Sequence, residues 1–165
     1  MRTGGSWTCS VNGMVYVRGA PADYNAWEAQ GCTGWGWQDM GRQFVAMEDH
    51  QLGSSEWRGV GGPLKVTVHP SGDELCDAII DAAAHIGTAT VADTNHVDSV
   101  TQGGFGYQPQ TTWKGQRFSA AKAFLDPVRT RPNLTVITGT HVQRIEFEGR
   151  RVAAVQVRGK EGERR

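Results

Sequence analysis

The sequence of 165 residues carries no excess of charge of either sign and no long hydrophobic run. Lysine plus arginine and aspartate plus glutamate number 17 each, so the formal net charge is zero at neutral pH. Nucleic acids and anionic membranes reward a basic surface, so we expect neither as the main partner. No run approaches the roughly 18 apolar residues that a membrane helix needs, and no signal-peptide core is present. We therefore predict no integral membrane segment and a cytoplasmic location.

Cysteine is scarce, and the residues that hold metals are scattered. The three cysteines, Cys9, Cys32 and Cys76, contain no C-x-x-C pair, which argues against a disulfide framework or a zinc site and favours a reducing compartment. The five histidines show no ligand spacing, so we predict no metal. The sequence also lacks G-x-G-x-x-G, a Walker loop, H-E-x-x-H and G-x-S-x-G.

Glycine and tryptophan are abundant, with 22 and six residues respectively. The opening stretch GGSWTCSVNGMVYVRG follows two glycines with hydroxyl residues, a pattern that lets backbone N–H groups approach an anion closely. A mobile N-terminus explains the same pattern equally well. Trp35, Trp37, Trp57 and Trp113 supply either a stacking platform for a ring or core contacts. Arg117, Arg129 and Arg131 offer either a phosphate site or a solvated surface.

Hydrophobic periodicity predicts an α+β fold, with helices and loops first and a small antiparallel sheet last. Helices are expected after Pro21, around 37–47, from a capping box of Ser71 and Glu74, and from Ser119 to near Pro132. We expect Leu75, Ile79, Ala83 and Ile86 to form the buried face of the third. Residues 11–17 fit either a strand or a buried loop, and 93–105 a loop. Strands are expected at 64–68, as an edge strand or a hairpin around Lys114 and Gly115, and in three segments starting at Leu134, Val142 and Val152, the last two joined at Glu148 and Gly149.

Several longer segments occur in a characteristic order. They include GGSWTCSVNGMVYVRGAPADYNAW, GWGW, EWRGVGGPLKVT, RFSAAKAFLDP and RPNLTVITGTHVQRIEFEGRRVAAVQV. The order, with N-G-M-V-Y-x-R-G and R-P-N-L-x-V-x-T as its most specific motifs, resembles the glucose–methanol–choline (GMC) family of flavin-dependent oxidoreductases, especially its bacterial choline-dehydrogenase-like branch. The resemblance covers nearly the whole chain.

This resemblance implies an enzyme that oxidises an alcohol to a carbonyl and passes the hydride to FAD N5, with the cofactor carrying the redox chemistry. It implies a partial Rossmann-like FAD-binding domain interleaved with part of an antiparallel-sheet substrate domain. Residues 1–157 would form the FAD-binding region, followed by a frayed charged tail at 158–165. The residues expected to contact FAD are Gly4, Gly5, Ser6, Asn12, Gly13, Met14, Val15 and, through its backbone beside the adenine, Val142.

The sequence departs from the family pattern in three ways. The loop before Asn12 is two residues longer than the family spacing, and Gly41-Arg42 replaces a Leu-Pro step. The family's ADP-binding strand and helix would precede Met1, and its catalytic histidine would follow Arg165. We therefore expect an internal segment with no catalytic residue of its own. Two rival hypotheses are a non-catalytic α+β interaction module with a Trp-rich surface and a different FAD enzyme, such as a ring hydroxylase or amine oxidase.

Overall fold

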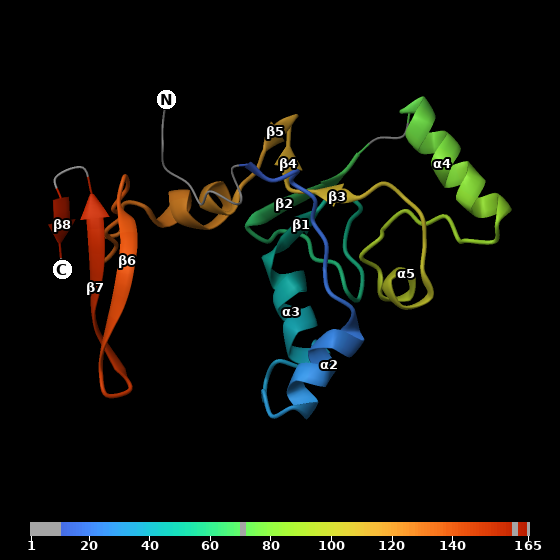
Figure 1. Cartoon of the computed structure of the whole chain (residues 1–165). Coiled ribbons are helices and arrows are strands. Elements are labelled where there is room, and N and C mark those ends of the chain that lie inside the picture. The colour runs from blue at the N-terminus through green and yellow to red at the C-terminus, as the bar shows by residue number, and fades with distance from the viewer. Residues whose placement is uncertain (1–10, 70–71, 160–161, 165) are drawn as a thin grey trace.

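The computed structural model describes residues 11–69, 72–159 and 162–164. Helices and sheet are mixed along the chain, as the α+β prediction requires (Figure 1). The elements are α2 (Pro21–Ala29), α3 (Trp37–Met47), β1 (Glu48–His50), β2 (Leu64–Val68), α4 (Glu74–His85), α5 (Val97–Gln102), β3 (Pro109–Gln110), β4 (Thr112–Trp113), β5 (Gln116–Arg117), η1 (Ala121–Leu125), η2 (Asp126–Val128), β6 (His141–Glu148), β7 (Arg151–Gly159) and β8 (Gly162–Arg164).

A small three-stranded sheet in the order β1-β2-β3 forms the centre of the fold. β1 runs parallel to β2, and β3 pairs antiparallel on the other side of β2. The expected strand at 64–68 is confirmed, and Pro109 lies on an edge strand, where a residue without an N–H is tolerated. Val66 is fully buried in a core cluster with Tyr16, Leu64 and Ala123.

The two N-terminal helices pack against each other through aromatic rings, below the sheet in Figure 1. Pro21 occupies the first turn of α2, where its missing N–H costs nothing. The ring of Tyr24 on α2 lies 5.7 Å from the ring of Trp37 and 5.9 Å from the ring of Phe44, both on α3. Both helices were predicted from the sequence, and both are confirmed.

Helix α4 forms where it was expected, but its cap and its environment differ from the prediction. Its N-cap is Asp73, whose carboxylate accepts from the Cys76 N–H at 2.9 Å. The capping box from Ser71, which itself lies outside the described residues, is therefore wrong. On the expected core face only Ala83 is buried, and the exposed fractions of Leu75 and Ile86 are 70% and 82%. The amphipathic spacing predicted the helix correctly, but the described residues leave most of its apolar face exposed.

Two further segments differ from the sequence-based expectation. The loop expected at 93–105 contains the short helix α5, which the His96 ring caps by accepting from the Asp98 N–H. The expected α-helix from Ser119 forms instead as one π-helical stretch, η1, followed by one 3₁₀ turn, η2. Pro127 at the start of η2 lacks an N–H and so cannot continue an α-helical ladder.

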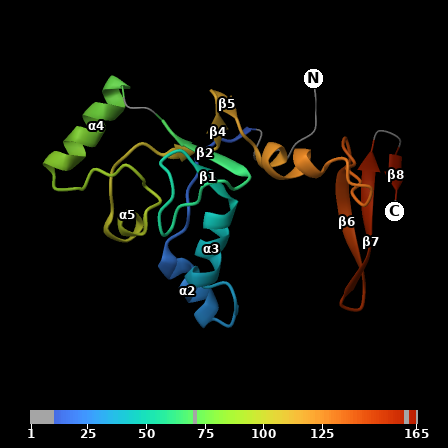
Figure 2. The same cartoon turned by 180° about the vertical axis from the view of Figure 1, so that it is seen from behind.

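The C-terminal segments form a separate antiparallel sheet in the order β6-β7-β8. No strand forms around Leu134, so one of the three expected strands is wrong, and the β6–β7 turn lies at Gly149 and Arg150, one residue later than predicted. Of the tail expected at 158–165, residues 158–159 belong to β7 and residues 162–164 form β8, whereas residues 160, 161 and 165 lie outside the described residues. Figure 1 and the reverse view in Figure 2 both place this sheet on the far side of η1 from β1–β3.

Candidate functional site

The predicted cofactor-contacting residues Asn12, Gly13, Met14 and Val15 form one compact turn, called here the 12–15 turn. The Asn12 side-chain oxygen accepts from the Met14 N–H at 3.0 Å, which closes an Asx turn. Met14 has a φ of 64°, a left-handed conformation that costs an L-residue about 1–2 kcal/mol. Such strain persists only where the surrounding structure enforces it, and it clusters at ligand-binding sites.

Contacts with the segment around β3 hold the inner side of the turn. The Thr111 N–H donates to the Met14 carbonyl at 2.8 Å, and the Tyr16 N–H donates to the Pro109 carbonyl at 2.7 Å. Val15 makes an isolated antiparallel bridge with Gln110. Residues 12–17 therefore form a loop with one bridge and no regular strand. Only Tyr16 among them is buried, so the expected buried loop is not confirmed either.

Among the residues that the structure describes, the outer side of the turn is exposed. Asn12 and Gly13 are exposed, and 51% of Val15 is exposed. A Cβ atom placed on Gly13 would meet nothing closer than the Val15 Cγ2 at 4.0 Å. The turn thus presents backbone polar groups without a side chain in front of them, which is the arrangement that admits a flat or anionic ligand against the chain.

Arg117, at the end of β5, contacts the same turn from the opposite part of the chain. Its Nη1 donates to the Asn12 Oδ1 at 2.9 Å, and its Nη2 donates to the Asn12 carbonyl at 2.8 Å. The sequence suggested a phosphate site or a solvated surface for Arg117, and the structure instead pairs it with a predicted site residue.

Val142, another predicted cofactor contact, is not brought to this turn. Val142 lies on β6 in the C-terminal sheet, where 56% of its surface is exposed and it pairs with Val157. Gly4, Gly5 and Ser6 lie outside the described residues.

A buried ion pair involves Arg18, three residues after the turn, and was not predicted from the sequence. The side chains of Arg18 and Glu48 are 2% and 1% exposed, and Arg18 Nη2 donates to Glu48. Arg18 Nη1 donates to the Trp57 carbonyl, and its guanidinium lies 5.2 Å from the centre of the Phe44 ring. A charged residue inside the otherwise apolar run MVYVRG is the signal that could have found this pair, because arginine is almost never buried unpaired.

Asn95 connects this ion pair to a second one. Its amide accepts from the Arg18 N–H at 2.9 Å and donates to the Tyr16 carbonyl at 2.8 Å. Asp93 accepts from the Asn95 N–H at 2.9 Å and from Arg58 Nη1 at 2.9 Å. Residues from distant parts of the sequence therefore fix the backbone that leads into the 12–15 turn.

Two titratable groups in this buried region have shifted pKa values. Burial lowers the pKa of the His50 imidazole below its usual range, although the Asp93 and Glu48 carboxylates act in the opposite direction. Burial raises the pKa of the Tyr16 phenol, and the neighbouring Glu48 carboxylate raises it further. His50 Nε2 is buried and has no hydrogen-bond partner among the residues that the structure describes.

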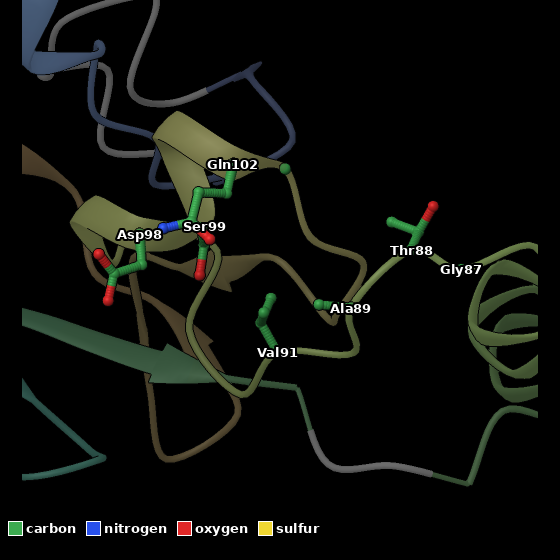
Figure 3. A pocket seen from close by; sticks show the side chains of 8 residues that line it. Gly87, Thr88, Ala89, Val91, Asp98, Ser99 and Gln102 are labelled. Atoms are coloured by element: carbon green, nitrogen blue, oxygen red, sulfur yellow. The ribbon is translucent and has the colours of Figure 1, made fainter.

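A cavity of about 370 Å³ lies elsewhere, between α5 and the segment that follows α4 (Figure 3). Thr88, Ala89 and Val91 lie on one side of it, and Asp98, Ser99 and Gln102 of α5 lie on the other. None of these residues belongs to the predicted site.

The remaining candidates separate into structural roles. Trp37 and Trp57 pack with ring centroids 5.4 Å apart. Trp113 lies elsewhere, on the β4–β5 hairpin, where the Lys65 ammonium from β2 lies over its ring. The four tryptophans therefore form no single platform. Arg129 faces Asp126 on its own turn.

No group of three or more metal-ligating side chains occurs in residues 11–69, 72–159 and 162–164. No helix in the described part is long and apolar enough to cross a membrane.

Comparison with known proteins agrees with the resemblance seen in the sequence. Residues 3–165 match the family model described as GMC oxidoreductase. An oxygen-dependent choline dehydrogenase from Rhizobium meliloti is 40% identical over 148 residues, which cover 90% of this chain and 26% of that protein. The chain thus spans about a quarter of the length of the curated relatives it matches.

Solved structures share the fold. Pyridoxine 4-oxidase from Mesorbium loti is 34% identical, with a TM-score of 0.80 over 93% of this chain and 30% of that protein. An FAD-dependent oxidoreductase from Chaetomium thermophilum is 25% identical, with a TM-score of 0.80 over 94% of this chain and 28% of that protein.

Proposed function

The chain belongs to the GMC oxidoreductase family, and on that premise we propose that it supplies the flavin-contacting segment of an FAD-dependent enzyme that oxidises an alcohol. The observation that carries the proposal is the 12–15 turn, which is held rigidly on its inner side and open on its outer side. FAD, when bound, supplies the hydride-accepting chemistry for the oxidation of CH–OH to a carbonyl.

The residues of the turn fit such a cofactor. A flavin or a pyrophosphate needs close approach to backbone groups, and Gly13 has no side chain to prevent it. Asn12, Gly13, Met14 and Val15 would hold the cofactor, and a turn that is already ordered loses little conformational entropy on binding. Gly4, Gly5 and Ser6 belong to the same proposed contact region by their position in the sequence.

Val142 is the proposed contact for the adenine. The proposal for this residue rests on its motif position in THVQRI and on its place near the start of a strand, whose backbone can offer both an N–H and a C=O. Its exposed side chain leaves that strand accessible.

The described residues bind and orient rather than transfer protons in this proposal. The five histidines lie apart, with His50 buried, His69 stacked on Tyr107, His85 at the end of α4, His96 capping α5 and His141 starting β6. We propose no catalytic base among them. The alcohol is a small molecule of the choline class, as the name of the 40% identical relative suggests, and its oxidation is a property of the whole polypeptide.

The test is FAD binding by the 165-residue chain. We expect the purified chain to retain flavin absorbance through gel filtration. The substitution Gly13→Ala should weaken FAD binding at least about tenfold, or about 1.4 kcal/mol, because the added methyl occupies the open side of the turn. Its free energy of unfolding should change by less than about 0.5 kcal/mol, because no atom of the described residues lies closer than 4.0 Å to the methyl.

Gly159→Ala, on β7, serves as the matched control. The Cβ of this alanine would lie 3.7 Å from the nearest atom, Thr140 Oγ1. This variant should bind FAD as the unchanged chain does. A folded chain that retains no flavin, or equal affinity in both variants, would refute the proposal.

A further inference from the structure

Arg117 and Asn12 are joined across 105 residues of sequence, and both of their contacts lie at the 12–15 turn. One guanidinium nitrogen donates to the Asn12 side chain and the other to the Asn12 backbone carbonyl. A planar guanidinium that donates twice fixes its acceptors in orientation as well as in distance, which an ammonium cannot do.

The side-chain oxygen of Asn12 accepts two hydrogen bonds at once. The first comes from Arg117 Nη1 at 2.9 Å, and the second comes from the Met14 N–H at 3.0 Å. An amide oxygen has two lone pairs, so these bonds use its full capacity. Arg117 therefore sets the rotamer of Asn12, and that rotamer in turn holds Met14 in its left-handed conformation.

Arg117 is not part of the buried core. It is half-buried at the end of the β4–β5 hairpin, whose strands have their own pairing between Thr112 and Arg117 and between Trp113 and Gln116. The hydrogen bonds of its guanidinium to Asn12 therefore tie the turn to a hairpin whose strands pair with each other.

We propose that Arg117 is a positioning residue for the flavin: it acts through Asn12 to hold the 12–15 turn in the conformation that receives the cofactor. The inference rests on the proposed function of that turn. The positive charge of Arg117 also lies next to the open side, where it favours an anionic ligand.

Two variants separate geometry from charge. Arg117→Ala removes both donors and the charge, whereas Arg117→Lys keeps the charge and loses the two-point contact. Arg129→Ala is the matched control, because Arg129 is an exposed arginine nearby in the sequence that faces Asp126 on its own turn. All three are made in the full 165-residue chain.

The first readout is amide hydrogen exchange at Met14 and Thr111 in the chain without flavin. We expect exchange to accelerate about tenfold or more in Arg117→Ala, to accelerate by a smaller factor in Arg117→Lys, and to stay unchanged in Arg129→Ala. Unchanged exchange in Arg117→Ala would overturn the inference, because the turn would then hold without the arginine.

The second readout is the affinity for FAD, with visible circular dichroism of the bound flavin as the signature of its orientation. Arg117→Ala and Arg117→Lys should each bind FAD about tenfold or more weakly with an altered flavin signal, and Arg129→Ala should match the unchanged chain. Full binding by Arg117→Lys would show that charge alone suffices and would overturn the inference. Failure of the unchanged chain to bind FAD would instead refute the proposed function, and the inference would fall with it.

Discussion

At the scale of single residues, the most demanding arrangement is the ion pair of Arg18 and Glu48. Taking two charges out of water is costly, and the cost is repaid only when every remaining donor and acceptor is used. Glu48 accepts from Arg18 and, at 3.1 Å, from the Gly59 N–H, whereas the buried Arg18 Nε has no hydrogen-bond partner among the described residues. The pair fixes a geometry more than it adds stability.

Substituting Glu48→Gln removes one charge and strands the other. We expect the free energy of unfolding to fall by about 3 kcal/mol, measured by urea denaturation, because the buried Arg18 loses its counter-ion. Asp49→Asn at the next position is the control, since the Asp49 and Lys65 side chains are 22% and 28% exposed, and it should cost no more than about 1 kcal/mol. Equal losses in the two variants would contradict this account.

His50 gives the protein a pH dependence whose sign follows from burial. Its pKa is lowered in the folded state, so the unfolded chain binds the proton more readily. The stability that the neutral His50 contributes to the folded state is complete above the ordinary histidine pKa near 6.5. It is lost as the pH falls through the lowered pKa of the folded state. Unfolding measured from pH 7.5 down to pH 5 should show less loss of stability in His50→Gln than in the unchanged chain, while the exposed His85→Gln should leave the slope as it is. A steeper fall of the unfolding free energy with falling pH in His50→Gln would contradict this sign for the His50 contribution.

At the scale of elements, the sequence predicted those whose signal is local. Helix α2 has Pro21 at its start, and α3 has an aromatic spacing that its neighbours satisfy, so both form as expected. The hairpin at Lys114 and Gly115 also forms, because both residues adopt the positive φ that its tight turn requires.

The elements that were mispredicted depend on more distant contacts. Residues 134–138 alternate as a strand should, but no described strand pairs with them. Capping at Asp73 instead of Ser71 was a choice between two residues of similar propensity. The buried face predicted for α4 is exposed because amphipathic spacing says which side of a helix is apolar but not what covers it.

In the candidate site, too, local sequence signals and long-range contacts differ in how far they could be predicted. The family resemblance pointed to Asn12, Gly13, Met14 and Val15, but the sequence predicted a strand or a buried loop there and not the turn that these residues form. The contact of Asn12 with Arg117 could not be predicted, because nothing in the sequence near either residue indicates a contact across 105 positions.

At the scale of the whole molecule, the C-terminal sheet leaves an apolar face open. The two register shifts in the β6–β7 pairing keep three apolar pairs opposite each other: Val142 with Val157, Ile145 with Val155, and Phe147 with Val152. The exposed fractions of Ile145 and Phe147 are 49% and 61%. A contiguous face of this kind promotes association.

We therefore expect the 165-residue chain to self-associate as its concentration rises, measured by light scattering on a sizing column. The double variant Ile145→Lys with Phe147→Lys should shift the chain toward the monomer, because it places two charges on the apolar face. Gln143→Lys, at the extra residue of the first register shift on the same strand, should have no such effect. A chain that stays monomeric over a tenfold range of concentration would count against this prediction.

The contact between Asn12 and Arg117 also has a consequence in time. A ribosome adds about 5–20 residues per second, so the 105 positions between them take roughly 5–20 seconds to synthesise. During that interval the segment that includes Val15 and Val17 has emerged, but the arginine that fixes its turn does not yet exist. The turn proposed to receive the flavin is thus completed only after β3, whose Pro109 and the adjacent Thr111 hold its inner side, has been synthesised.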